Sequence, residues 1–189
     1  MKKTIFQLIN KTLIIILAAI TMNITANAQG KGDKSLGISL IYGSLINKYV
    51  DYNNAGIGTK YRYNLSRIVR LESSFNYLFE KDFVSSWDLF ENLHILIPLN
   101  KQITIYPLAG IGVFGFKADY PIVTDEWGYS YDNSKSYTKL GFNFLGSGID
   151  LKITDKLILN AEWCFKGEFL MNDARGPGSI FSAGINYKF

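Results

Sequence analysis

The sequence predicts an all-β protein: an eight-stranded antiparallel up-and-down barrel that crosses a membrane, after a cleaved signal peptide. Three observations support this prediction. The N-terminal segment is typical of exported proteins, the remaining chain alternates apolar and polar residues, and its connections alternate between short and long. Alternation with period two gives a strand one apolar and one polar face, and strands separated by turn residues at regular spacing predict a sheet.

The first 28 residues resemble a signal peptide. Lys2 and Lys3 precede the apolar run 13–20, and the small-x-small sequence Ala26-Asn27-Ala28 forms a cleavage site. The apolar run of eight residues is much shorter than the roughly 20 that a spanning helix needs. We therefore expect cleavage after Ala28, with residues 29–189 forming one barrel domain.

Charge and cysteine content argue against a nucleic-acid-binding protein and against a fold held by internal disulfides. Residues 1–28 hold three lysines and no acid, so the remaining chain has a formal charge of +1 rather than +4, and we expect no binding to nucleic acid. Cys164 is the single cysteine and cannot form an internal disulfide. After residue 28 no apolar run is long enough for a membrane helix, so any crossing must use strands.

Eight segments are predicted to be strands, and their connections differ in length in a regular way. The segments are 35–43, 55–65, 67–80, 86–98, 101–117, 137–153, 156–169 and 180–189. Tight turns at 64–67, 98–101 and 154–156 alternate with longer connections at about 44–54, 81–85, 118–136 and 170–179. Short periplasmic turns and long extracellular loops are typical of a membrane barrel with both termini in the periplasm.

The faces of the strands agree with this reading. In the seventh segment the apolar Leu159, Ala161 and Trp163 alternate with Asn160 and Glu162. The polar set contains charges of both signs, which suits a packed polar interior, while the apolar set would face lipid. The alternation changes phase near Phe144 and Leu145, which predicts a β-bulge there.

Three segments resemble a known family. The last ten residues alternate strictly and end on Phe189, which resembles the closing strand of bacterial outer-membrane β-barrels. The segments 106–113 and 146–151, rich in glycine, are similar to the small barrels related to the transmembrane domain of outer membrane protein A. This resemblance implies the outer membrane of a Gram-negative cell, contact with its lipid, and recognition of Tyr187 and Phe189 as an assembly signal by the barrel assembly machinery.

An eight-stranded barrel has an interior that side chains can fill. The predicted inward residues include ten that we expect to form a polar network: Lys60, Arg62, Arg70, Glu72, His94, Asp150, Lys152, Glu162, Lys166 and Glu168. Asn76, Asn92, Asn160, Ser182 and Lys188 share this face. Buried charges must be paired, so we expect the inward bases to meet Glu72, Asp150, Glu162 and Glu168 in a rigid network. The alternative to a closed, rigid interior is a narrow channel or small-solute carrier.

Enzymatic readings find little support in these residues. His94 is the one histidine and is followed by Ile95-Leu96, so the His-x-Ser pattern of the small lipid A deacylase barrels is absent. One histidine and one cysteine, seventy residues apart, make a poor metal site. The pair Gly110-x-Gly112 lacks the third glycine of a dinucleotide-binding loop. We expect no enzyme activity, no cofactor and no metal.

The third long connection combines acids with aromatic residues, which suits contact with a surface glycan or protein, and oxygen ligands could also hold Ca²⁺. The alternative is a solvated loop whose aromatics rest on the rim of the barrel. The candidate contact residues are Tyr120, Asp125, Glu126, Trp127, Tyr129 and Tyr131. Together these features predict a non-enzymatic barrel with a structural or surface-interaction role.

Overall fold

The computed structural model describes residues 30–47, 51–124, 126–127, 130–131, 134–168 and 175–189. The expected signal peptide, 1–28, lies outside the described residues. Eight long strands correspond to the eight predicted segments: β1 (Lys34–Asn47), β2 (Asp51–Asn64), β3 (Val69–Lys81), β4 (Val84–Ile95), β6 (Ile103–Ala118), β9 (Lys135–Lys152), β10 (Leu157–Glu168) and β11 (Arg175–Lys188). Three two-residue strands complete the described structure: β5 (Ile97–Pro98), β7 (Val123–Thr124) and β8 (Ser130–Tyr131).

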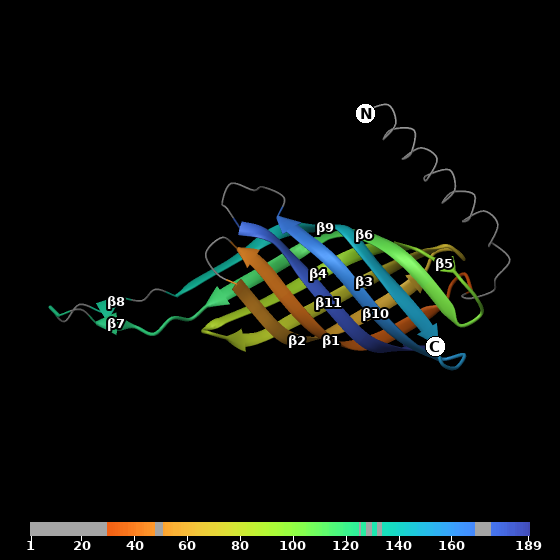
Figure 1. Ribbon diagram of the computed structural model, residues 1–189, viewed down its shortest axis with the longest axis horizontal. Helices are drawn as coiled ribbons and strands as arrows, with labels where there is room; N and C mark the ends of the chain where they lie inside the picture. The colour runs from red at the N-terminus through yellow and green to blue at the C-terminus, as the bar shows by residue number, and fades with distance from the viewer. Residues whose placement is uncertain (1–29, 48–50, 125, 128–129, 132–133, 169–174) are drawn as a thin grey trace, which may run out of the picture.

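The long strands close into a single barrel (Figure 1). Each long strand pairs antiparallel with the next long strand in the sequence, the short β5 continues the β4 side of the ladder with β6, and β1 pairs with β11 to close the sheet. Closure leaves no free edge among the eight, and the predicted up-and-down eight-stranded barrel is confirmed.

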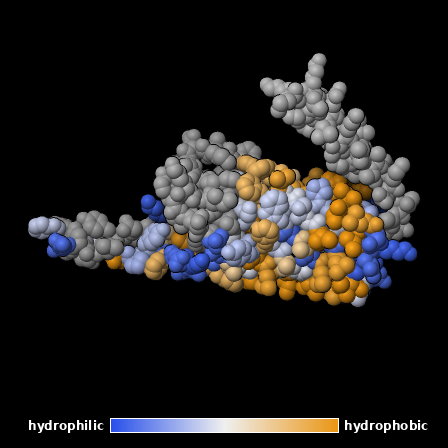
Figure 2. All heavy atoms as spheres, viewed as in Figure 1, coloured by the Kyte–Doolittle hydropathy of each residue, from blue (hydrophilic) through white to orange (hydrophobic). Residues whose placement is uncertain are grey.

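The wall is apolar outside and polar inside. On β1, Ile38 and Leu40 are 65% and 72% exposed, whereas the inward Arg62 and Arg70 are 2% and 1% exposed. Figure 2 shows apolar residues gathered over the barrel wall and hydrophilic residues at both ends of the molecule. A water-soluble barrel would reverse these faces, so this wall suits a hydrocarbon surrounding. In the part of the chain described, no helix has the length and apolarity to span a bilayer.

One end of the barrel, which we call the turn end, carries three similar turns of four residues: 65–68, 99–102 and 153–156. The second residue of each turn has a side-chain oxygen that accepts from two backbone N–H groups. Asn100 Oδ1 accepts from Gln102 and Ile103 at 2.8 Å each, while Ser66 and Thr154 do the same in their turns. Short polar side chains of this kind favour tight turns, and this explains why the three hairpins are so regular.

At the opposite end, two of the four connections predicted to be long are short. β1 extends to Asn47 and β2 begins at Asp51, so only 48–50 separate them. Between β3 and β4 only Asp82 and Phe83 remain, both with positive φ (51° and 66°). Positive φ at both central residues matches the twist of a two-residue hairpin, but phenylalanine at such a position gives no turn signal in the sequence. The predictions of loops at 44–54 and 81–85 were therefore wrong.

The third connection is long, and its described part contains a short strand pair. Residues 119–134, which we call the arm, contain the antiparallel pair β7 and β8, in which Val123 pairs with Tyr131. β6 and β9 lead into the arm, which projects beyond the barrel (Figure 1). The fourth connection, expected at 170–179, is shortened because β11 begins at Arg175, and 169–174 lie outside the described residues.

The register shifts in several ladders, and two of the irregularities have a clear cause in the sequence. Phe165 pairs with Leu145 and Lys166 with Asn143, so Phe144 is the extra residue of a bulge. Phe144 and Leu145 both face outward, 53% and 57% exposed, and the predicted bulge is confirmed. β4 and β5 keep one register with β6, but their pairing is interrupted opposite Pro107, which has no N–H to donate.

Candidate functional site: the barrel interior and the arm

The middle of the barrel holds a layer of ionised side chains that we call the central ion-pair layer. Three bases and three acids form it: Lys60, Arg62, Arg70, Glu72, Asp150 and Glu162. Each is less than a tenth exposed. Because the formal charges balance, the layer can remain ionised without an uncompensated buried charge.

Arg62 is the centre of this layer and contacts all three acids. Its Nε donates to Oε2 of Glu72 at 2.6 Å, and its Nη1 donates to Oδ1 of Asp150 at 3.0 Å. Its Nη2 donates to Glu162 and, at 3.2 Å, to the hydroxyl of Tyr106. Arg62 lies on β2 while Asp150 and Glu162 lie on β9 and β10, so these bonds cross the interior rather than follow one strand pair.

Arg70 extends the layer toward the histidine. Its Nη1 donates to Oδ2 of Asp150 at 2.6 Å and its Nε donates to Nδ1 of His94 at 3.1 Å. His94 stacks on Tyr106 with ring centroids 4.7 Å apart and planes 6° apart, and the Arg70 guanidinium lies 4.5 Å from the Tyr106 ring centroid. Since Nδ1 of His94 accepts from a guanidinium, the imidazole here is neutral.

Tyr106 fits inside because its ladder partner is glycine. Gly148 pairs with both Tyr106 and Glu162, and a Cβ at this position would collide with the Tyr106 ring. The hydroxyl of Tyr106 lies 2.7 Å from Oε1 of Glu162 and 3.3 Å from Oδ1 of Asp150. The glycine-rich segment of β9 thus makes room for a large side chain from β6.

A second polar layer lies nearer the arm. Lys166 pairs with Asp88 at 2.7 Å, and Asn76 donates to the same carboxylate at 2.8 Å. Lys166 Nζ also lies 4.5 Å from the ring centroid of Phe90, an inward side chain with no exposed surface. Asn143 donates to Asn92 at 2.7 Å between the two layers. The two layers place ion pairs, amide groups and the rings of Phe90, Tyr106 and His94 inside the barrel.

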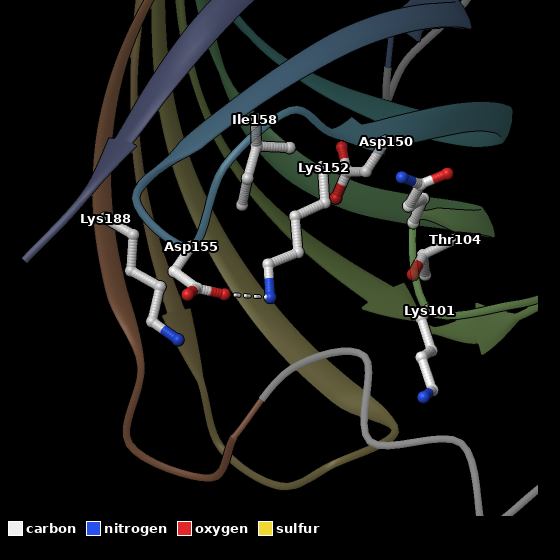
Figure 3. A pocket seen from close by; sticks show the side chains of 8 residues that line it. Lys101, Thr104, Asp150, Lys152, Asp155, Ile158 and Lys188 are labelled. Carbon is white, nitrogen blue, oxygen red and sulfur yellow. Dashed lines mark ion pairs between the residues drawn. The ribbon is translucent and has the colours of Figure 1, made fainter.

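A small cavity lies at the turn end of the barrel (Figure 3). Its volume of about 10 Å³ is close to the minimum that holds one water molecule. Lys152 and Asp155 pair beside it at 2.6 Å, and Lys188 pairs with Asp33 at 2.5 Å. Of the charged residues that line this mouth, Asp150, Lys152, Asp155 and Lys188 are held in ion pairs.

The structure locates most of the predicted network residues inside the barrel. Lys60, Arg62, Arg70, Glu72, His94, Asp150, Glu162 and Lys166 contact one another or other inward groups, while Lys152 lies at the turn-end mouth. The side chain of Glu168 lies outside the described part. Lys166 pairs with Asp88, which is not among the acids predicted to pair with the inward bases.

Two inward residues that contact the polar layers, Asp88 and Tyr106, were not predicted from the sequence. Asp88 shares the parity of Asn92 and His94, so extending the alternation four residues upstream would have found it. Tyr106 carries no such signal, because the inward face of β6 also holds Leu108 and reads as apolar. Its partner Gly148 becomes informative only once the register is known.

The chemistry available in the central layer is limited by its own ion pairs. Glu72, His94 and Glu162 offer potential metal-ligand atoms within 4.8 Å of one another. Both carboxylates already accept from Arg62, and Arg70 occupies Nδ1 of His94. A divalent cation would add charge to a layer in which three bases already balance three acids, so the residues present do not fit a metal ion.

The arm exposes some of the predicted contact residues. Trp127 is 85% exposed and Tyr120 is 45% exposed, with the ring of Tyr120 6.4 Å from that of Phe83. Glu126 is also exposed. Asp125 and Tyr129 lie outside the described residues, as does the side chain of Tyr131. The exposure of Trp127 differs from the alternative expectation, in which the aromatics rest on the rim.

The predicted assembly residues lie at the turn end of the closing strand. Tyr187 pairs with Leu36 on β1 and is 50% exposed, while Phe189 is 65% exposed and donates its N–H to the carbonyl of Lys34 at 3.1 Å. Both side chains therefore lie on the outer surface of the wall.

The sequence matches the family model described as "Outer membrane protein beta-barrel domain" over residues 12–189. The chain belongs to this family. Its outward apolar wall is accordingly the lipid-facing surface of an outer membrane β-barrel, and its polar interior is a lumen enclosed by membrane. No match was found among curated proteins.

Solved structures of similar fold come from several bacteria. Neisserial surface protein A superimposes with a TM-score of 0.67 at 11% identity, covering 82% of this chain and 97% of that one. Ail, the attachment invasion locus protein of Yersinia pestis, in complex with the heparin analogue sucrose octasulfate, gives 0.53 at 19% identity, covering 84% and 99%. The N-terminal barrel of OprF from Pseudomonas aeruginosa gives 0.52 at 14% identity, covering 85% and 100%. At these identities the similarity concerns the fold.

Proposed function

We propose that this outer membrane β-barrel is a non-enzymatic, non-conducting protein with a structural and surface-interaction role. The observation that carries the proposal is the central ion-pair layer, in which Arg62 contacts Glu72 on the adjacent strand and reaches Asp150 and Glu162 across the lumen. Moving ions through this layer would require separating buried pairs, each of which is costly to break. The side chains of the lumen therefore stabilise the barrel, and any partner binds to the outer surface.

The orientation follows from the two ends. We assign the turn end to the periplasm and the arm to the cell exterior, because extracellular loops are the long ones in barrels of this kind and all three connections at the turn end have four residues. The connections 48–50 and 82–83 at the arm end are also short, so the length of the arm carries this assignment. Its partners are then outer-membrane lipid along the wall, the barrel assembly machinery at Tyr187 and Phe189, and a surface glycan or protein at the arm. Loops held by a rigid scaffold are the usual place for such binding.

The net charge of the arm indicates which class of ligand it can bind. Between Lys117 and Lys135 the sequence holds four acids and only these two bases. Ail is solved with a sulphated heparin analogue, but a net negative arm would repel a polyanion. We therefore assign to the arm a neutral glycan or a protein surface, contacted by the exposed ring of Trp127.

Acyl transfer would need a nucleophilic side chain beside a free general base, and the candidate residues do not supply this pair. The ring of His94 is occupied by Arg70 and Tyr106, and Cys164 packs against the apolar cluster of Leu96 and Leu108. The hydroxyl of Ser182 accepts from Lys60 Nζ at 2.9 Å, but Lys60 is the donor there and is also held in an ion pair with Glu162, so this pair does not supply the general base that acyl transfer needs. This supports a non-enzymatic barrel.

Conductance tests the closed lumen. The purified barrel inserted into planar lipid bilayers should give no stable conductance steps. Discrete and reproducible steps that change when Arg62 or Lys60 is replaced would contradict the proposal and favour a narrow channel instead.

Binding tests the arm. Immobilised neutral oligosaccharides and sulphated oligosaccharides are the probes, with Trp127→Ala compared with Trp163→Ala, whose tryptophan lies on the wall. Weakened binding of a neutral glycan by Trp127→Ala alone supports the assignment. Binding of only the sulphated glycans would contradict it.

A further inference from the structure

An unexplained carboxylate lies on the lipid-facing wall. Glu91 of β4 is exposed on the outer surface, between Leu89 and Leu93, which are 46% and 45% exposed. Its neighbours Phe90 and Asn92 point into the lumen and are buried. Within the described part of the chain, Glu91 has no hydrogen-bond or ion-pair partner. The lumen network therefore does not account for it.

The register places Glu91 near the middle of the membrane. A row of ladder partners runs from Tyr61 through Ser73, Glu91 and Ile111 to Phe142. Tyr61 lies near the turn end of β2, whereas Phe142 lies in the half of β9 nearer the arm. Because barrel strands tilt by about 35–45°, such a row climbs steadily across the bilayer. Glu91 is the central member of the row.

The same depth follows from β4 alone. On the turn side of Glu91 the outward residues are Leu93 and Ile95, and on the arm side they are Leu89 and Trp87. An ionisable group at this depth is costly when it faces only hydrocarbon, and such groups in membrane proteins mark sites with a partner. The ladder partner of Glu91 on β3 is Ser73, whose side chain carries a hydroxyl group.

We propose that Glu91 and Ser73 are the centre of an interface between two copies of this barrel. A two-fold axis along the membrane normal, passing between β3 and β4, would bring β4 of each copy against β3 of the other. At this tilt, ladder partners on neighbouring strands differ in depth by only about 3 Å. A glutamate side chain can span that step, so Glu91 of one copy meets Ser73 of the second, and the reverse. Each carboxyl group then accepts from a hydroxyl, twice in one interface.

The surrounding residues suit a second copy better than lipid. Leu71 and Phe75 on β3 and Leu89 and Leu93 on β4 form an apolar frame around the polar centre. Acyl chains have no donor for a carboxyl group, and lipid headgroups lie at the membrane surfaces rather than at the midplane. A second barrel supplies both the donor and apolar contacts at the required depth.

Sedimentation equilibrium of the purified barrel in density-matched detergent micelles tests this interface. The wild type should associate as a dimer, and Glu91→Leu should raise the dissociation constant by about tenfold or more, since two hydrogen bonds are lost. Glu91→Gln, which keeps an acceptor, should retain part of the association. Urea unfolding of Glu91→Leu should show a barrel at least as stable as the wild type, so lost association is not misfolding.

Two tryptophan substitutions provide matched controls on opposite walls. Ser73→Trp places a bulky ring at the centre of the interface and should abolish association. Ala183→Trp makes a similar change on β11, on the far side of the closed sheet, and should leave it intact. The proposal is overturned if the wild type is monomeric at every protein-to-detergent ratio, if Glu91→Leu associates as the wild type does, or if both tryptophan variants behave alike. A monomeric barrel would leave the closed lumen and the arm of the proposed function unaffected.

Discussion

Replacing Arg62 with leucine tests whether the central ion-pair layer stabilises the barrel. The substitution removes the base that contacts Glu72, Asp150 and Glu162 together. Asp150 keeps Arg70 and Glu162 keeps Lys60. Glu72 loses its one lysine or arginine partner among the described side chains and keeps only Asn92 at 3.4 Å and His94 at 3.8 Å.

The expected loss in the free energy of unfolding is large because the unpaired carboxylate of Glu72 would be buried, at 1% exposure. Removing one partner of a buried ion pair typically costs about 3–5 kcal/mol, and we expect Arg62→Leu to lower the free energy of unfolding by that amount. The double variant Arg62→Leu/Glu72→Gln removes both charges, so it should recover much of this loss. Arg67→Leu removes an exposed arginine from a turn and should have little effect.

Urea titration of the barrel folded into phospholipid vesicles measures these differences, with tryptophan fluorescence and the migration of unboiled protein on a detergent gel as independent probes. The reasoning is refuted if Arg62→Leu lies within about 1 kcal/mol of the wild type, because breaking a buried pair should cost at least 3. It is also refuted if the double variant is less stable than the single one.

Three further outcomes are expected. Phe189→Asp should lower the amount of folded barrel in the outer membrane more than any substitution in the arm, as measured by immunoblotting of membrane fractions; equal amounts would contradict an assembly role. Ala161→Arg, a charge on the lipid-facing wall, should cost roughly 2–4 kcal/mol if it lies at the bilayer midplane, and replacement of the inward Ser182 should cost less, by the same urea titration; the reverse order would mean that the faces are inverted. The hydrogen bond from Lys152 and its charge lower the pKa of Asp155 below its ordinary 3.8. The stabilisation from this pair is thus complete above pH 3.8 and is lost as the pH falls through the lowered pKa, which carboxyl NMR titration against Lys152→Met would detect.

The number of strands, their order and their two faces could be predicted from the sequence because side-chain alternation is a local property of a strand. The polar parity of β2, β3 and β10 places Arg62, Arg70 and Glu162 on the inward face without knowledge of any contact. The bulge at Phe144 was predictable for the same reason, since an extra residue changes the phase of the pattern.

Connection lengths were less predictable because turns depend on backbone angles that polar composition does not reveal. Asp82 and Phe83 form a tight hairpin with positive φ, although phenylalanine rarely adopts it. The arm reads as a loop because β7 and β8 have only two residues each, too few for a pattern.

Only the tertiary structure decided which charges meet inside the lumen. Arg62 and Asp150 are 88 residues apart, and Lys60 and Glu162 are 102 apart. Lys166 meets Asp88 rather than another predicted acid because closure brings β10 and β4 to face each other across the interior. The alternation predicts that a side chain points inward. Its position along the barrel axis, which we call its height, depends on the register and stagger of all eight strands. Ion pairing depends on that height, so the sequence by itself determined the set of inward charges, and the closed sheet determined their partners.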